Sequence, residues 1–297
     1  MFVLSGSSNL PLAKKLAKKL ACELTPVELS RFPNSEARVW IKSGNINDTA
    51  VVLQSFSDPA DNHILEFCLL VDAVRRLGAK QIVVVIPWMG YCIQDKIFRR
   101  GEPLSARVVA DIIQSTKVDS IITVDLHNET TLGFFNTPLI HLSANPLFVE
   151  FFKKKGNIDV LVAPDIGAAK ESGQMARELG LPLATISKKR DLNTGKVTIL
   201  GIEGEVKGKR VLITDDFIST GSTLIQTAEY LKKRGATKVT VAVTHHLFVP
   251  GVQEKLEKSQ IDELYISDTI KNQYPQSKLL QVLSLAGIIA EAIKSRI

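Results

Sequence analysis

Short apolar runs alternate with longer amphipathic segments along almost the whole chain. Residues 50–53, 82–86 and 121–124 are nearly all apolar, as in strands that are buried on both faces. Between them, residues 64–77 and 106–113 place apolar side chains at helical spacing. Strands that alternate with helices in this way are typical of a parallel sheet covered by helices. The pattern therefore predicts an α/β protein.

The same order of elements occurs twice. In the first half, VVLQSFSD precedes a helical segment that ends in RRLGAKQIVVVIP; in the second, VLITDDFIS precedes one that ends in KKRGATKVTVAVTH. Gly78 and Gly235 take corresponding places after basic residues, where a glycine in the left-handed conformation ends a helix. The repetition predicts two domains that arose by duplication.

The length of 297 residues also favours two domains, each with its own core. No linker rich in Pro, Gly or Ser separates the halves, and the best boundary lies at residues 142–146. We assign residues 1–143 to an N-terminal domain and residues 144–278 to a C-terminal domain. Residues 279–297 are largely apolar and predict a helix that can pack on either half; we assign it to the N-terminal domain.

Composition narrows the functional classes. Hydrophobic residues make up 45% of the chain and charged residues 23%, which is ordinary for a globular protein. The three cysteines indicate neither a disulfide framework nor a zinc site, and no apolar run reaches membrane-spanning length, so we expect a cytoplasmic protein without membrane contact. The net charge of +6 suits anionic ligands, but aromatic residues are only 6%, which argues against nucleic-acid binding.

Two adjacent carboxylates mark the place where the two copies differ most. Asp215 and Asp216 follow residues 211–214, a predicted strand, whereas the first copy has Ser55-Phe56-Ser57-Asp58-Pro59 there. Ligands of open α/β sheets bind at the carboxyl ends of the strands. Because carboxylates only accept hydrogen bonds, an adjacent pair can hold the two hydroxyls of a ribose diol.

The loop behind the carboxylates is Thr220-Gly221-Ser222-Thr223, and it leads into a predicted helix. Backbone N–H groups at the start of a helix suit a phosphate, and Gly221 permits close approach. With the carboxylates, the loop predicts a ribose 5-phosphate site. The alternative is that Asp216 or Ser219 only caps the helix; two carboxylates followed by such a loop favour the ligand site.

This stretch resembles the phosphoribosyl-diphosphate signature of the type I phosphoribosyltransferase fold. Further motifs resemble the ribose-phosphate diphosphokinase family, in the expected order over nearly the whole chain. They are RFPNSEARVW (31–40), GYCIQDKIFRRGEPLSARVVADII (90–113), VDLHNETTLGFF (124–135), APDIGAAK (163–170) and ISKKRDLNTG (186–195). The resemblance implies two duplicated phosphoribosyltransferase-like domains, each a mainly parallel sheet flanked by helices.

The resemblance also implies an activity and its substrates. The family transfers the diphosphoryl group of MgATP to the C1 hydroxyl of ribose 5-phosphate, giving 5-phosphoribosyl 1-diphosphate and AMP for nucleotide biosynthesis. Its members form homodimers that often assemble into hexamers. The residues that match the family's ATP site are Phe32, Asn34, Glu36, Gln94, Asp95 and His127.

Metal and phosphate contacts follow from the same resemblance. His127 and Asp165 match groups that organise Mg²⁺ on the ATP phosphates, and such side chains suit a partly hydrated magnesium. The diphosphate loop matches Asp165, Gly167, Ala168 and Lys170. The ribose 5-phosphate site matches Asp215, Asp216, Ser219, Thr220, Gly221, Ser222 and Thr223. Taken alone, residues 31–40 would be an ordinary turn and His127 a structural histidine.

Lys188 and Arg190 match the cations of the family's mobile catalytic loop. There they would stabilise charge that develops on the transferred phosphoryl group. A basic, flexible loop suits a lid that excludes water. The alternative is a solvated basic turn, since Asp191-Leu192-Asn193-Thr194-Gly195 follows.

Two positions depart from the family pattern. Ile93 precedes Gln94 where the family usually has an arginine, which removes a cation expected near ATP; Lys96, Arg99 or Arg100 are candidates to replace it. Ser219 stands where many members have an aspartate, although serine also occurs among relatives.

Two rival functions stay open. An ordinary phosphoribosyltransferase would share the carboxylate pair and its loop, but it needs only one such domain and a hood over the base. A non-catalytic regulatory homologue would explain Ile93, yet it has no reason to retain Lys188, Arg190, His127 and Asp165 together.

Overall fold

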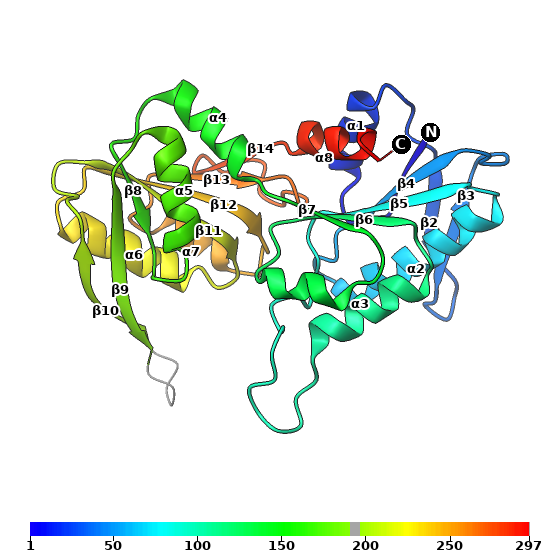
Figure 1. Ribbon diagram of the computed structural model, residues 1–297, viewed down its shortest axis with the longest axis horizontal. Helices are drawn as coiled ribbons and strands as arrows, with labels where there is room; N and C mark the ends of the chain where they lie inside the picture. The colour runs from blue at the N-terminus through cyan, green and yellow to red at the C-terminus, as the bar shows by residue number, and fades with distance from the viewer. Residues whose placement is uncertain (191–196, 297) are drawn as a thin grey trace. The chain divides into compact units, whose positions relative to one another are not determined.

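The computed structural model describes residues 1–190 and 197–296. The chain divides into two compact units. Unit 1 comprises Met1–Ser143, Asp268–Lys271 and Ser284–Ile297, and unit 2 comprises Ala144–Ser267 and Asn272–Leu283. Each unit is built on a mainly parallel sheet with helices on both faces, so the predicted fold class is confirmed (Figure 1).

Unit 1 has a parallel sheet with the strand order β1-β4-β5-β6-β7. The strands are β1 (Phe2–Ser5), β4 (Thr49–Leu53), β5 (Gln81–Ile86), β6 (Ser120–Val124) and β7 (Leu139–Leu142). Every residue of β4 and β6 is buried. Helices cover both faces of these strands, which is why their sequences are apolar at consecutive positions.

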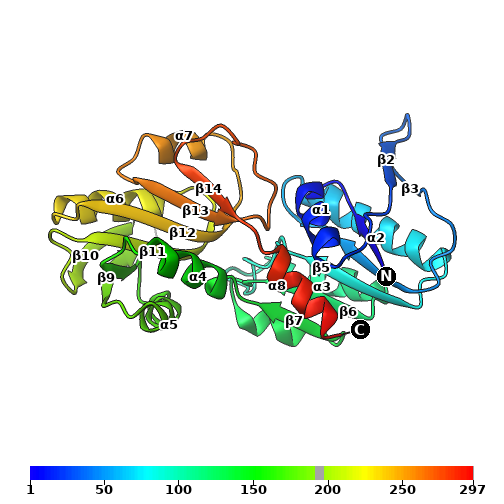
Figure 2. The ribbon, with the colours of Figure 1, turned by 90° about the horizontal axis from the view of Figure 1, so that it is seen from above.

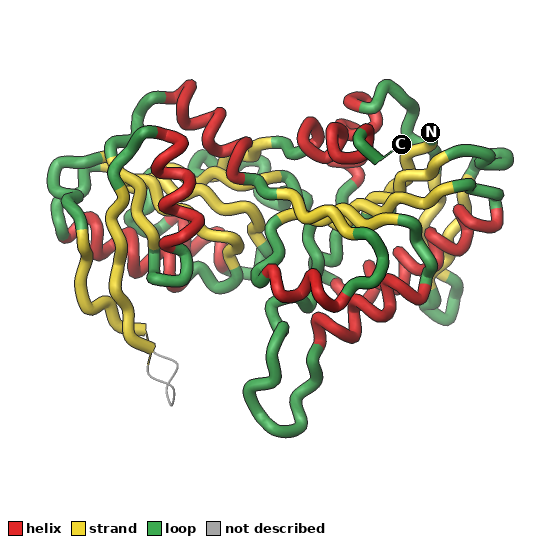
Figure 3. Tube along the Cα trace, in the orientation of Figure 1, coloured by secondary structure: helices red, strands yellow, loops and turns green. Residues whose placement is uncertain are grey.

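Helices α1 (Leu10–Lys19) and α8 (Ala286–Lys294) pack together on one face of this sheet, and α2 (Ala60–Arg76) and α3 (Ser105–Ser115) lie on the other (Figure 1). The strands β2 (Val27–Arg31) and β3 (Ala37–Ile41) form a separate antiparallel hairpin. A long loop, residues 87–104, joins β5 to α3 (Figure 3). The 3₁₀ helix η1 (Glu129–Phe134) precedes β7.

Unit 2 has a sheet with the order β10-β9-β8-β11-β12-β13-β14, in which the edge strand β10 alone is antiparallel among the described strands. The strands are β8 (Val160–Ala163), β9 (Leu183–Arg190), β10 (Val197–Glu203), β11 (Arg210–Ile218), β12 (Lys238–His246), β13 (Glu263–Ser267) and β14 (Leu280–Leu283). Helices α4 (Asn145–Lys155) and α5 (Ala169–Leu179) lie on one face, and α6 (Ser222–Lys233) and α7 (Val252–Glu257) on the other (Figure 2).

The prediction of one helix over residues 279–297 is wrong in its first part. Leu280–Leu283 form β14, which pairs in parallel with β13, and the helix begins at Ala286. The spacing of Leu280 and Leu283 suits a helix, but the edge of β13 offers backbone partners: the N–H of Leu264 donates to the carbonyl of Leu279 at 3.0 Å. Tertiary pairing therefore overrides the local periodicity.

The strand pairing aligns the two copies residue by residue. The first residue of β5 pairs with the first residue of β4, and the first residue of β12 pairs with the first residue of β11. Strands β1 and β8 each begin opposite the second residue of β4 and β11. Counted from these pairs, the corresponding residues are Gln54 and Asp215, Ser55 and Asp216, and Ser7 and Asp165.

Candidate functional site

Asp215 and Asp216 lie in β11, beyond the point where its neighbour β8 ends. Ile213 is the last residue of β11 that pairs with β8, whereas pairing with β12 continues to Ile218. The predicted strand end after residue 214 is therefore too early, because β12 continues to offer backbone partners. The carboxylates still lie past the carboxyl end of β8, where ligands of such sheets bind.

Three carboxylates gather at this edge of unit 2. Burial and the adjacent charge of Asp216, with a further contribution from Asp165, raise the pKa of Asp215 well above its ordinary value. The N–H of Asp216 donates to Oδ1 of Asp215 at 3.0 Å, and the N–H of Phe217 donates to Oδ1 of Asp216 at 2.9 Å. The clustered negative charge favours hydroxyl donors or a cation at this edge.

Lys188 adds a cation to the same edge. Its Nζ donates to Oγ1 of Thr227 on α6 at 3.0 Å. Burial lowers the pKa of Lys188, and the charges of Asp165 and Asp215 act against this effect. The ammonium group is thus held within electrostatic range of two of the carboxylates.

The predicted loop at Lys188 and Arg190 is wrong for the backbone of both residues, because they belong to β9. Lys188 pairs with Ile199, and Arg190 pairs with Val197. The antiparallel partner β10 extends the strand, which the sequence pattern did not indicate. The side chain of Arg190 and residues 191–196, which include the predicted lid, lie outside the described part of the chain.

The loop after β11 brings its backbone to the start of α6. Gly221 takes the N-cap position with φ +71°, a conformation that favours glycine. Gly221, and not Asp216 or Ser219, is the N-cap residue of this helix, so the alternative in which one of those two residues takes the cap position is wrong. Thr220 and Ser222 are exposed. The first N–H groups of α6 and these hydroxyls form the donor set that a phosphate requires.

The loop after β8 makes a turn at the start of α5. Oδ1 of Asp165 accepts a hydrogen bond from the N–H of Ala168 at 3.0 Å, and a Cβ at Gly167 would lie 3.2 Å from the same oxygen. Ser172 and Thr214 join their hydroxyls at 2.9 Å, which ties α5 to β11. Lys170 is exposed on the first turn of α5. The predicted diphosphate residues therefore border the carboxylate cluster.

The predicted adenine contacts lie at the tip of the β2–β3 hairpin in unit 1. Phe32 and Glu36 close the turn, with the N–H of Phe32 donating to the carbonyl of Glu36 at 2.9 Å. Asn34 stabilises it by accepting the N–H of Glu36 at 3.3 Å. The Phe32 ring is 48% exposed, with the Arg38 guanidinium 5.9 Å from its centre. An exposed ring of this kind can stack on a planar base.

Gln94 and Asp95 lie near the middle of the loop between β5 and α3. The Gln94 carbonyl accepts the N–H of Ala106 at 3.2 Å, so Gln94 is tied to the start of α3. Asp95 accepts a hydrogen bond from the side-chain amide of Asn128, in the loop after β6. These bonds bring Gln94 and Asp95 close to the segment that carries His127.

Ile93 and His127 line one small hollow, together with Cys92 and Asp125. Ile93, which stands where the family usually has an arginine, therefore lies beside His127, a residue predicted to contact the ATP phosphates. Lys96, a candidate replacement for the missing cation, has its Nζ 4.0 Å from the carboxylate of Asp95.

His127 belongs to unit 1 and Asp165 to unit 2, and each is described within its own unit. Within residues 1–190 and 197–296, no group of three or more His, Cys, Asp or Glu side chains is placed to hold a metal ion. A magnesium contact by these two residues therefore stays a prediction. In the part of the chain that the structure describes, no helix is long and apolar enough to cross a membrane.

Thr227 was not singled out from the sequence. It is fully buried on the same face of α6 as Leu224, Ala228 and Leu231. A single threonine in an apolar stripe is an ordinary core residue by pattern. The hydroxyl of Thr227 on an otherwise apolar helix face is the signal that could have pointed to this residue, because a buried hydroxyl requires a hydrogen-bond partner.

The two copied sheets and the carboxylate-lined edge define a protein of the type I phosphoribosyltransferase fold. Residues 1–116 match the family model of the N-terminal domain of ribose phosphate pyrophosphokinase, and residues 134–273 match that of the phosphoribosyl transferase domain. The chain belongs to the ribose-phosphate pyrophosphokinase family. The predicted family, fold and enzyme class are confirmed.

Relatives match over nearly the full length. The ribose-phosphate pyrophosphokinase of Thermotoga maritima is 36% identical over 297 residues, covering 99% of this chain and 94% of that protein. Ribose-phosphate pyrophosphokinase 1 of Lactococcus lactis is 36% identical over 294 residues, covering 97% and 90%. The crystal structure of phosphoribosylpyrophosphate synthetase from Mycobacterium smegmatis is similar with a TM-score of 0.90 and 31% identity, covering 99% and 98%.

Proposed function

We propose that this chain transfers the diphosphoryl group of MgATP to the C1 hydroxyl of ribose 5-phosphate, giving 5-phosphoribosyl 1-diphosphate and AMP for nucleotide biosynthesis. The observation that carries the proposal is the edge of unit 2 where the carboxylates of Asp165 and Asp215 lie within electrostatic range of the Lys188 ammonium, with Asp216 next to Asp215. At this edge, the carboxylates suit the hydroxyls of the sugar, the start of α6 suits its 5-phosphate, and the Lys188 ammonium suits the transferred diphosphoryl group.

Ribose 5-phosphate binds at the end of β11. Asp215 and Asp216 accept hydrogen bonds from the two ribose hydroxyls, which stabilises the charged form of Asp215 against the burial and the adjacent charge of Asp216 that raise its pKa. The 5-phosphate lies at the start of α6, where the backbone N–H groups and the dipole favour an anion. The residues assigned to this phosphate are Ser219, Thr220, Gly221, Ser222 and Thr223.

The transferred group lies along the loop that begins α5. Asp165, Gly167, Ala168 and Lys170 are assigned to the diphosphate, and Lys188 and Arg190 to the charge that develops on the phosphoryl group. Such transfers depend on positioning and on positive charge more than on covalent chemistry. The hydrogen-bond partner of the Lys188 ammonium is the neutral hydroxyl of Thr227, which orients the ammonium group without neutralising it.

ATP is assigned to unit 1 through Phe32, Asn34, Glu36, Gln94, Asp95 and His127. Magnesium is assigned to Asp165 and His127, with most of its ligands supplied by phosphate oxygens and water. The surplus of carboxylates over cations at the edge of unit 2 fits a cation, which would supply neutralising charge for the phosphates. A cytoplasmic homodimer, assembled further into a hexamer, is the assembly that we propose.

The test is to incubate the purified chain with MgATP and ribose 5-phosphate and to measure AMP and phosphoribosyl diphosphate. Equal amounts of the two products are expected. Formation of nucleotide from phosphoribosyl diphosphate and a free base, without AMP from ATP, would instead identify a phosphoribosyltransferase.

The relatives named ribose-phosphate pyrophosphokinase count against a regulatory homologue, and the observation in its favour is that the apolar Ile93 lies in the same hollow as His127. A regulatory homologue predicts binding of MgATP without turnover, and activity only of a catalytic partner mixed with it. Binding and turnover measured on the same preparation separate the two functions.

A further inference from the structure

Unit 1 contains the counterparts of the two strand ends that carry the carboxylates of the candidate site in unit 2. By strand correspondence, Ser7 takes the place of Asp165 and Gln54 takes the place of Asp215. Helix α2 has 17 residues and α6 has 12, although both end just before a left-handed glycine. The first turn of α2 therefore takes the place of the loop that precedes α6, and Glu66 lies in the next turn, with its carboxylate against the loop after β1.

The carboxylate of Glu66 lies against the loop after β1. Its Oε1 accepts hydrogen bonds from the N–H of Ser7 at 2.7 Å, from the Ser7 hydroxyl at 2.9 Å and from Nε2 of Gln54 at 2.7 Å. A backbone N–H, a hydroxyl and an amide that converge on one anionic oxygen form the donor set that binds a phosphate oxygen. Glu66 thus stands where an anionic ligand would bind.

Gln54 closes the space beneath the same loop. It is fully buried, and its Oε1 accepts the N–H of Ser8 at 3.2 Å and the Ser8 hydroxyl at 2.7 Å. A Cβ on Gly6 would lie 2.3 Å from this oxygen, so the amide packs directly against the backbone of the loop. In a binding site, the corresponding acceptor would face the ligand. Here Oε1 of Gln54 already accepts hydrogen bonds from Ser8 of the same unit.

The backbone of residues 268–269 covers the polar groups next to Gln54. Nδ2 of Asn9 donates to the carbonyl oxygens of Asp268 at 2.7 Å and Thr269 at 3.2 Å. The Ser55 hydroxyl also donates to the carbonyl of Thr269. Ser55 stands where unit 2 has Asp216, so a peptide carbonyl lies at the place that corresponds to the ribose hydroxyls.

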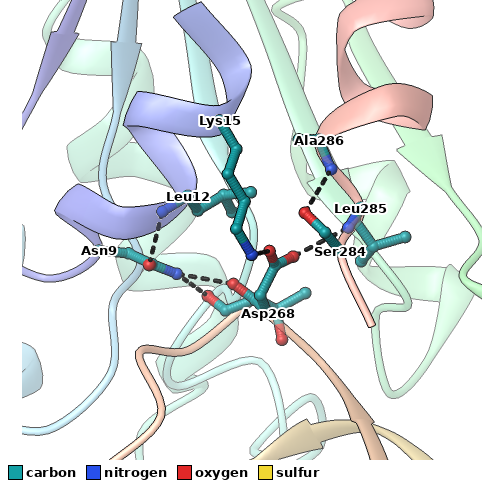
Figure 4. A network of polar contacts seen from close by, with 8 residues as sticks. Asn9, Leu12, Lys15, Asp268, Ser284, Leu285 and Ala286 are labelled. Carbon is teal, nitrogen blue, oxygen red and sulfur yellow. Dashed lines mark hydrogen bonds and ion pairs between the residues drawn. The ribbon is translucent and has the colours of Figure 1, made fainter. Parts of the chain in front are cut away.

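The segment is fixed from its other side as well. The carboxylate of Asp268 accepts hydrogen bonds from Nζ of Lys15 and from the N–H of Leu285, each at 2.9 Å (Figure 4). Asp268 and Thr269 are buried. Helix α1, the start of α8 and the loop after β1 therefore hold this segment together.

We infer that unit 1 keeps the ligand-binding edge of its fold but fills it from within the chain. Glu66 takes the place of an anionic ligand, and the backbone of residues 268–269 takes the place of a sugar. The identification of the replaced ligands as an anion and a sugar rests on the function proposed for unit 2. Two consequences follow: the chain binds one ribose 5-phosphate, and the loop after β1 takes an anion of the phosphate or sulfate class once the Glu66 carboxylate is removed.

The experiment measures thermal unfolding of Glu66→Ala and of the unaltered chain in sulfate and in chloride at equal ionic strength. Sulfate stabilises any protein through exclusion, and the phosphate loop proposed in unit 2 is also expected to take it, so the readout is the difference between the two proteins. We expect Glu66→Ala to unfold several degrees lower in chloride and to recover at least half of this loss in sulfate. Asp72→Ala, which removes an exposed carboxylate from the same helix, is the matched control and should respond to sulfate as the unaltered chain does.

An equal sulfate response in Glu66→Ala and the unaltered chain would overturn the inference. Should Glu66→Ala not fold, Glu66→Gln keeps an acceptor for Ser7 and should show a smaller response of the same sign. Calorimetric titration of the unaltered chain provides a second test, because two ribose 5-phosphate sites per chain would contradict a filled unit 1. None of the unfolding measurements needs turnover, so an inactive chain would refute the proposed function and leave this inference standing.

Discussion

The Nζ of Lys188 lies 3.0 Å from the hydroxyl oxygen of Thr227, which is fully buried on α6. A hydroxyl orients an ammonium group without neutralising it and leaves its other N–H groups for a substrate. We therefore predict that Thr227→Val, which keeps the shape and removes the acceptor, lowers kcat about five-fold, the equivalent of ~1 kcal/mol. The KM values for ATP and ribose 5-phosphate should change little, and Thr227→Ser should restore kcat.

The control is the same substitution in a Lys188→Ala background. Lys188→Ala alone should lower kcat by ~10²-fold, on the scale of a lost electrostatic donor. If Thr227 acts through Lys188, adding Thr227→Val to Lys188→Ala should cost nothing more. Multiplicative losses in the double variant would show that Thr227 only supports the packing of α6.

The carboxylate pair should decide sugar binding. Asp215→Asn combined with Asp216→Asn replaces two carboxylates by neutral amides. The ribose hydroxyls then lose the charged oxygens that accept their hydrogen bonds. We expect ribose 5-phosphate affinity to fall by roughly ten-fold or more, on the scale of charge-assisted hydrogen bonds. Affinity for MgATP should fall far less. Equal losses for both substrates, measured by equilibrium binding, would remove this pair from the sugar site.

Ile93 should limit ATP affinity, because it lies in the hollow with His127. Ile93→Arg adds a planar, charged donor group there, and a charge-assisted contact is worth ~1.5–3 kcal/mol. We expect the apparent KM for ATP to fall roughly ten-fold. Steady-state kinetics at varied ATP provide the measurement. If Ile93→Arg leaves the KM unchanged or lowers turnover, a nearby cation such as Lys96 or Arg99 already serves the phosphates.

One ion pair gives unit 2 a pH-dependent part of its stability. Arg210 donates from Nε and Nη2 to the two carboxylate oxygens of Asp159, at 3.0 and 2.7 Å, and lowers the pKa of Asp159 to about 2. Because the folded pKa is lower than the unfolded value near 4, the pair stabilises the fold fully above about pH 5 and loses this effect as the pH falls towards 2.

Asp159→Asn should therefore unfold a few degrees below the unaltered chain at pH 7, a small difference because solvent screens a partly exposed ion pair. The difference should shrink steadily below pH 5. Thermal unfolding followed by circular dichroism between pH 3 and 7 measures it. A difference that is constant over this range would mean that the side chain of Asp159 acts through packing rather than charge.

Much of the fold could be predicted from the sequence because its signals are local. Buried parallel strands such as β4 and β6 are written as apolar runs, and Gly78 and Gly235 both adopt the left-handed conformation expected after a helix. Strand ends were harder to predict. Whether Asp215 or Lys188 lies in a strand depends on the length of the neighbouring strand, β12 or β10, and no pattern within the segment itself contains that information.

Parts of the candidate site depend on contacts between distant residues. The carboxylate pair at 215–216 was visible as a motif, but the bond from Lys188 to Thr227 joins residues 39 positions apart. The same holds for Asn9, which binds the backbone 259 and 260 residues further on. A single sequence shows that such groups are polar, and only the fold shows what satisfies them.

The chain of unit 1 is interrupted by unit 2, since its last stretches, residues 268–271 and 284–297, follow almost all of unit 2 in the sequence. Domains usually fold during synthesis in the order in which they leave the ribosome. Here the first unit to emerge lacks α8, which packs on α1, and the segment that binds Asn9, so the face of its sheet that carries α1 is completed only after the rest of the chain has been made. The nascent first half is then a candidate client for chaperones, and a stop codon before residue 268 would damage the unit that was already translated.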